Sequence, residues 1–129
     1  MDVYRTDRIR NVVLLGHGGS GKTTLAEAMA YLAGMTNRLG RVEDGNTVSD
    51  FDKEEQKREF SISTSLVPIE WEKAKINILD TPGHQDFAED TYRTLTAVDS
   101  VIIVVDGAKG VETQTRKLME VCRMRNTPV

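Results

Sequence analysis

The sequence predicts an α/β fold in which helices cover both faces of a mainly parallel β-sheet, with one antiparallel strand at its edge. Short aliphatic runs alternate with helical patterns along the chain, and a glycine-rich loop joins the first run to the first helix. A later run contains Pro68 and is followed at once by another run across a two-residue turn. Because proline cannot donate to a central ladder, that strand belongs at the edge of the sheet.

The elements follow from local patterns. The first strand is β-branched and aliphatic and stops at glycine, which is typical of a buried parallel strand. The first helix carries an apolar face at helical spacing and ends at Gly34, a suitable C-terminal cap. Strands are predicted at Ile9–Gly16, Ser65–Trp71, Ala74–Asp80 and Asp99–Gly107; helices are predicted at Lys22–Gly34, Gln85–Val98 and Val111–Arg125; the apolar positions of the first helix are Leu25, Ala28, Met29 and Leu32.

Composition narrows the class of protein. The 129 residues suffice for one domain, and a formal net charge of −3 gives no overall basic field of the kind that nucleic-acid binding favours. The single cysteine, Cys122, excludes an internal disulfide and fits a reducing compartment. The chain shows neither a membrane-length apolar run nor the apolar core of a signal peptide. We therefore expect a cytoplasmic protein with no membrane partner.

The loop "GHGGSGKT", residues 16–23, matches the phosphate-loop (P-loop) spacing. It follows a strand and opens a helix, which is the context that the motif requires. Its backbone N–H groups can converge on phosphates at the helix N-terminus, while Lys22 reaches the outer phosphates and the Thr23 hydroxyl ligates Mg²⁺. The predicted phosphate-binding residues here are Gly18, Gly19, Ser20, Gly21, Lys22, Thr23 and Thr24.

The stretch "DTPGH" ends the third predicted strand. Asp80 there lies at the sheet edge where ligands bind in open α/β folds, and it is a second candidate Mg²⁺ ligand. Gly83 offers a backbone N–H to a γ-phosphate, and a neutral His84 imidazole could orient an attacking water. The long polar segment before it, from Met35 to Arg58, is typical of a functional lid or of a disordered segment, and it is compatible with an exposed helix at Asp52–Glu59.

With these motifs the chain resembles the GTP-binding (G) domain of the translational GTPases and their P-loop NTPase fold. The part up to Gly83 is similar to elongation factor G, particularly its secondary paralogue, and the part from His84 onward is similar to bacterial peptide chain release factor 3. The resemblance implies GTP or GDP and Mg²⁺ as ligands, GTP hydrolysis with His84 as the catalytic residue, and the ribosome as partner of the full-length protein. It also implies switch I at about residues 35–64, with Ser61 as a Mg²⁺ ligand, and switch II at about residues 80–90.

The guanine-reading Asn-Lys-x-Asp motif of that family does not occur in this sequence. We therefore expect residues 1–129 to be the N-terminal part of a G domain, truncated before the guanine-reading strands. The edge of the strand "VIIVV" should then favour self-association. Two alternatives remain open: a non-catalytic truncated or chimeric fragment that keeps only the phosphate-binding half of the site, and a generic P-loop NTPase. A release-factor role and an elongation-factor role are also not distinguished.

Overall fold

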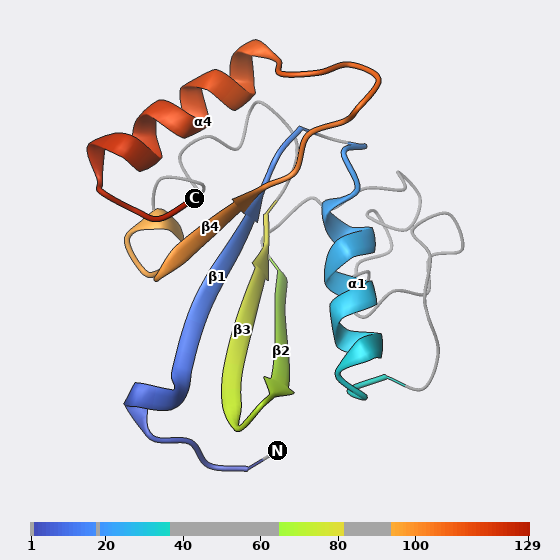
Figure 1. Ribbon diagram of the computed structural model, residues 1–129, viewed down its shortest axis with the longest axis vertical. Helices are drawn as coiled ribbons and strands as arrows, with labels where there is room; N and C mark the ends of the chain where they lie inside the picture. The colour runs from blue at the N-terminus through green and yellow to red at the C-terminus, as the bar shows by residue number, and fades with distance from the viewer. Residues whose placement is uncertain (1, 18, 37–64, 82–93) are drawn as a thin grey trace.

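The computed structural model describes residues 2–17, 19–36, 65–81 and 94–129. Its sheet has four strands in the order β2-β3-β1-β4. The strands are β1 (Ile9–Leu15), β2 (Ser65–Trp71), β3 (Ala74–Asp80) and β4 (Ser100–Ile103); the helices are the short 3-10 helix η1 (Thr6–Arg8), α1 (Lys22–Leu32) and α4 (Thr113–Met124). Strand β1 pairs in parallel with both β3 and β4, whereas β2 pairs antiparallel with β3. The mainly parallel sheet and its antiparallel edge strand are as predicted, and Figure 1 shows this arrangement.

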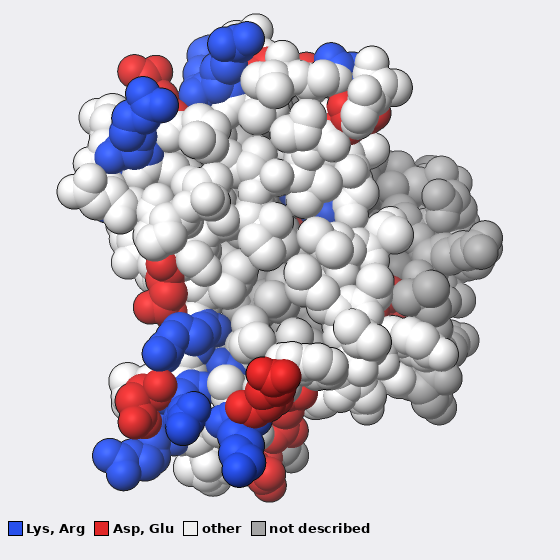
Figure 2. Space-filling model, in the orientation of Figure 1, with Lys and Arg blue, Asp and Glu red and all other residues white. Residues whose placement is uncertain are grey.

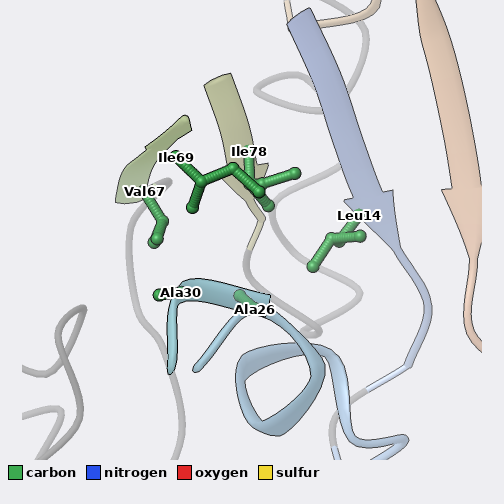
Figure 3. Packing of buried hydrophobic residues seen from close by; sticks show 6 residues of the cluster. All are labelled: Leu14, Ala26, Ala30, Val67, Ile69 and Ile78. Atoms are coloured by element: carbon green, nitrogen blue, oxygen red, sulfur yellow. The ribbon is translucent and has the colours of Figure 1, made fainter. Parts of the chain in front are cut away.

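Two helices cover opposite faces of the sheet, which makes three layers. Alternate residues of β1 point to the two sides. Leu14 packs with Ala26 and Ala30 of α1 and with side chains of β2 and β3, as Figure 3 shows. Val13 and Leu15 belong instead to a second core with Cys122 of α4. The period-2 alternation of a strand therefore supplies both cores from one segment.

The face that α1 buries differs from the predicted one. Its fully buried apolar residues are Ala26 and Ala30, whereas Leu32 is 73% exposed. Leu25 and Met29 do pack against the core, as partly buried side chains. Alanine at the centre of the contact lets the helix backbone approach the sheet closely, and the longer side chains then flank it.

Both helices end in Schellman motifs. Gly34 after α1 has φ 76°, and the Met35 N–H donates to the carbonyl of Ala30. After α4 the left-handed position is taken by Asn126, with φ 53°, and the Thr127 N–H donates to the carbonyl of Cys122. The predicted cap at Gly34 is thus confirmed.

Strand β4 is shorter than predicted. After Ile103 only the Val104 N–H still bonds to β1, at Leu15. Beyond it Asp106 folds its own turn, because its carboxylate accepts from the Ala108 N–H and its carbonyl accepts from the Gly110 N–H. On its other side β4 receives the end of the chain, where the Val101 N–H donates to the carbonyl of Pro128 at 2.9 Å.

Candidate nucleotide-binding site

The P-loop lies at the carboxyl end of the parallel strands, between β1 and α1 (Figure 1). Gly16 begins it, and a Cβ at this position would lie 2.5 Å from the carbonyl oxygen of Val104. Only glycine fits between β1 and the segment after β4 without moving backbone. The loop ends at Gly21, whose φ of 101° is in the left-handed region, and α1 begins at the next residue. The glycines therefore shape a turn that ends at a helix N-terminus.

The helix N-terminus presents backbone donors. The first bond of the α1 ladder runs from the Leu25 N–H to the carbonyl of Gly21. The N–H groups of Lys22, Thr23 and Thr24 therefore precede the helix's own ladder, which leaves such groups to caps or ligands. Together with the helix dipole they favour an anion at this point.

Lys22 is buried beside this turn, with 6% of its surface exposed. Its ammonium donates to the carbonyl of His17 at 3.3 Å. Burial lowers the pKa of Lys22 below its usual value, and the negative charge of Asp80 partly opposes that shift. A buried cation is costly unless an anion compensates it. The position is therefore suited to binding a phosphate.

Thr23 and Asp80 meet although they are 57 residues apart. The Thr23 hydroxyl donates to a carboxylate oxygen of Asp80 at 2.6 Å, and Asp80 is completely buried at the end of β3. A hydroxyl and a carboxylate side by side form an oxygen donor set of the kind that Mg²⁺ prefers. The residues present thus fit the predicted metal, although the described part of the chain contains no cluster of three or more acidic, His or Cys ligands.

The segment after β4 lies beside the P-loop, close to Gly16. The hydrogen bond from the Ala108 N–H to Asp106, together with the charges of Lys109 and His17, lowers the pKa of the Asp106 carboxyl. His17 is itself 7% exposed, and its carbonyl also accepts from the Ser20 N–H at 3.2 Å. Sequence motifs gave no sign that this segment lies beside the P-loop; the close approach of Val104 to Gly16 is a tertiary contact.

Comparison with known proteins identifies the family. The family model described as "Elongation factor Tu GTP binding domain" matches residues 7–129. The chain belongs to the elongation factor Tu GTP-binding domain family. Within it, the chain is 48% identical over 124 residues to peptide chain release factor 3 of Staphylococcus haemolyticus, covering 93% of this chain and 24% of the relative. It is also 48% identical over 127 residues to peptide chain release factor 3 of Aromatoleum aromaticum, covering 95% of this chain and 23% of that protein.

Solved structures agree with this assignment. A crystal structure of a protein from Thermus thermophilus superposes with a TM-score of 0.87 at 36% identity, covering 94% of this chain and 18% of the other. A bacterial selenocysteine-specific elongation factor, EF-Sec, superposes with a TM-score of 0.69 at 26% identity, covering 88% of this chain and 17% of the other. The chain thus corresponds to the translation-factor GTP-binding domain and spans about a quarter of the length of the release factors that it matches.

The release-factor similarity covers 93% or 95% of the chain and so includes both sides of Gly83. The structure brings together three of the predicted site residues, Lys22, Thr23 and Asp80. Four predicted site residues lie outside the described residues: Gly18, Ser61, Gly83 and His84. Switch I apart from Met35 and Thr36, and switch II after Thr81, fall there as well. So does the predicted helix Gln85–Val98 as far as residue 93, and its described part is helical at Thr94 and Leu95.

The surface charge and the length of the apolar helices give little indication of a macromolecular partner. On the face shown in Figure 2, acidic and basic side chains lie intermingled at the end of the molecule that carries the N-terminal segment. No helix in the part of the chain that the structure describes is long and apolar enough to cross a membrane.

Proposed function

We propose that this chain binds GTP or GDP together with Mg²⁺ and acts as the GTP-hydrolysing domain of a ribosome-associated translation factor of the release factor 3 type. The observation that supports it most is the contact of Thr23 with Asp80 beside the buried Lys22. Three polar side chains from two separate segments converge there at the N-terminus of α1. Such a convergence has little value for stability and is typical of a phosphate and metal site.

The division of roles follows from the chemistry of each group. Lys22 would hold the outer phosphates, and its ammonium would regain the charge stabilisation that burial removes. The N–H groups at the start of α1, with those of Gly18, Gly19, Ser20 and Gly21, would bind phosphate oxygens. Thr23 and Asp80 would hold Mg²⁺, with Ser61 as a further ligand; the ion, when bound, neutralises phosphate charge.

His84 is proposed as the catalytic residue and Gly83 as a γ-phosphate ligand. Both follow Thr81 closely in sequence, and Thr81 is fixed beside the site by its burial. A neutral imidazole there would orient water, because phosphoryl transfer depends on positioning and electrostatics. The role in termination, rather than elongation, rests on the similarity to release factor 3.

A titration tests the proposal. The chain is titrated into a fluorescent GTP analogue with Mg²⁺, and GTP, GDP, ATP and inorganic triphosphate are used as competitors. GTP and GDP should displace the probe. ATP and triphosphate competing as well as GTP would mean that this chain holds the phosphates without reading the base. Absence of any binding by the folded chain would contradict the proposal. A Lys22→Met variant, which removes only the ammonium charge, serves as the matched negative control.

Self-association through β4 is a further proposal. This strand has β1 on one side, and on the other only the Val101 N–H bond to Pro128 is seen among the described residues. Edge donors and acceptors favour pairing with a second chain. Light scattering should show an average mass that rises with concentration, and a constant monomer mass would contradict this expectation. A Val101→Pro substitution removes a backbone donor of β4 and should reduce the rise of average mass with concentration.

A further inference from the structure

Two consecutive side chains at the end of β3 are anchored in different directions. Asp80 accepts the hydrogen bond of Thr23 from α1. Thr81, with 1% of its surface exposed, donates its hydroxyl to the carbonyl of Leu14 in β1 at 2.6 Å. The end of β3 is therefore held both to the helix that follows the P-loop and to the strand that precedes it.

The bond from Thr81 lies at the last pair of the β1–β3 ladder. Leu14 is the partner of Asp80 in the parallel register, so this pair ends the pairing of β3 with β1. The residue after Thr81 is Pro82, which has no backbone N–H to extend that pairing. The Thr81 hydroxyl adds a side-chain bond to the Leu14 carbonyl where this pairing ends. It fixes the backbone immediately after Asp80, which is itself completely buried.

We propose that Thr81 is a positioning residue of the nucleotide site. Its bond to Leu14 holds the Asp80 carboxylate against Thr23, and it thereby sets how strongly Mg²⁺ increases nucleotide affinity. This inference rests on the function proposed above. Thr81 touches neither phosphate nor metal in this role. It acts through Asp80, and its effect is therefore specific to the metal-dependent part of binding.

The geometry makes the effect selective. Lys22 and the start of α1 are held by the P-loop turn and by the bonds to His17, none of which involves Thr81. Loss of the Thr81 hydroxyl leaves the buried Leu14 carbonyl without this donor, and such a loss is typically worth about a factor of ten in an equilibrium constant. Losing this bond should therefore displace Asp80, with little effect on Lys22 and the start of α1.

The first test compares dissociation constants of a fluorescent GDP analogue with excess Mg²⁺ and with EDTA. Thr81→Val removes the hydroxyl at nearly constant size, and Thr81→Ser retains it. Thr115→Val is the matched control, because it removes a buried threonine hydroxyl of α4 that has no hydrogen-bond partner among the described residues. T81V should lose about tenfold of the Mg²⁺-dependent gain with an unchanged value in EDTA, while T81S and T115V should match the wild type.

Equal losses in Mg²⁺ and in EDTA would show a merely structural role and overturn the proposal, as would a wild-type ratio in T81V. Should T81V not fold, Thr81→Cys replaces it, since a thiol is a weak donor of similar size. The ratio of its dissociation constants in EDTA and in Mg²⁺ should be lower than that of T81S and the wild type, but some Mg²⁺-dependent gain should remain. A ratio equal to the wild type would count against the proposal.

A second test needs no nucleotide and separates this inference from the proposed function. Urea unfolding is measured for T81V, Thr23→Val and the double variant. If Thr81 positions Asp80 for Thr23, the two substitutions disrupt the same arrangement. The loss of unfolding free energy in the double variant should then be smaller than the sum of the losses in the two single variants. Additive shifts would overturn the positioning role even if the chain binds nucleotide. Non-additive shifts would support it even if the wild type binds none.

Discussion

Lys22 and Asp80 are charged side chains that have almost no contact with solvent. Each belongs to a sequence motif, and the structure shows what the motif cannot: how burial changes their chemistry. The pKa of Lys22 is lowered chiefly because its ammonium is desolvated. The charge of a bound phosphate would reverse that effect, so the residue is poised to gain from ligand binding.

Tyr4 provides a test of electrostatics away from the site. Its hydroxyl donates to the Glu70 carboxylate of β2, and this bond raises the pKa of Tyr4 to about 12. The raised pKa means that the stabilising contribution of the bond is complete below pH 10 and is lost as the pH rises through about 12. Ultraviolet titration of tyrosinate should show one late step near that value.

Glu70→Gln should move this step towards the ordinary tyrosine pKa, because the negative acceptor is removed. Tyr31→Phe is the control and should leave the late step in place, whereas Tyr4→Phe should abolish it. A late step that persists in Tyr4→Phe would show that another tyrosine is responsible, and the assignment of the raised pKa to the Tyr4–Glu70 pair would be wrong.

The hairpin of β2 and β3 is closed by the two-residue turn that the sequence predicts, with Trp71 paired to Ala74. Its turn residues are Glu72 and Lys73, with φ of 48° and 63°. Both lie in the left-handed region that asparagine and glycine tolerate best. The turn therefore satisfies the strand twist at a local conformational cost.

Replacing Glu72-Lys73 by Asn-Gly should raise the free energy of unfolding by about 1 kcal/mol, because the new residues adopt these angles with less strain. Urea unfolding measures the change. The control exchanges the two residues, Glu72→Lys with Lys73→Glu, which keeps composition and should change stability by less than about 0.5 kcal/mol. A destabilised Asn-Gly variant would argue against a strained turn.

At the scale of the molecule, the described residues form two separate cores on the two faces of one sheet, and β1 contributes to both. The proposed nucleotide site lies where β1, β3 and α1 meet. Ligand binding should therefore stabilise the fold as a unit. At a Mg²⁺·GDP concentration a hundred times the dissociation constant, the expected gain is about 2.7 kcal/mol, seen as a rise of several degrees in the melting temperature.

Calorimetry or thermal fluorescence with increasing Mg²⁺·GDP measures this gain. Lys22→Met should lose the ligand-dependent rise while keeping a cooperative transition without ligand, because it replaces a costly buried charge with an apolar side chain. A rise of equal size in K22M would show that the stabilisation arises elsewhere on the molecule.

Local sequence patterns predict much of this architecture. The aliphatic runs, the glycine-rich loop, the edge proline and the Gly34 cap each act on their own neighbours, so the element order, the antiparallel edge and the P-loop could be predicted from residues in sequence. The face of a helix that packs against the sheet could not be predicted in this way, because it depends on tertiary packing. The helix α1 turns Ala26 and Ala30 to the sheet, rather than Leu32, because backbone approach outweighs the size of the side chain.

Distance along the chain explains what remained for the tertiary structure to decide. Strand β4 ends at Ile103 because the next residues fold beside Gly16 and make their own turn at Asp106. Thr23 meets Asp80 across 57 residues, and Thr81 meets Leu14 across 67. Local patterns name such residues as candidates, but parallel pairing of β1 with β3 is what brings them into contact. A motif specifies the groups; the register of the sheet sets their distances.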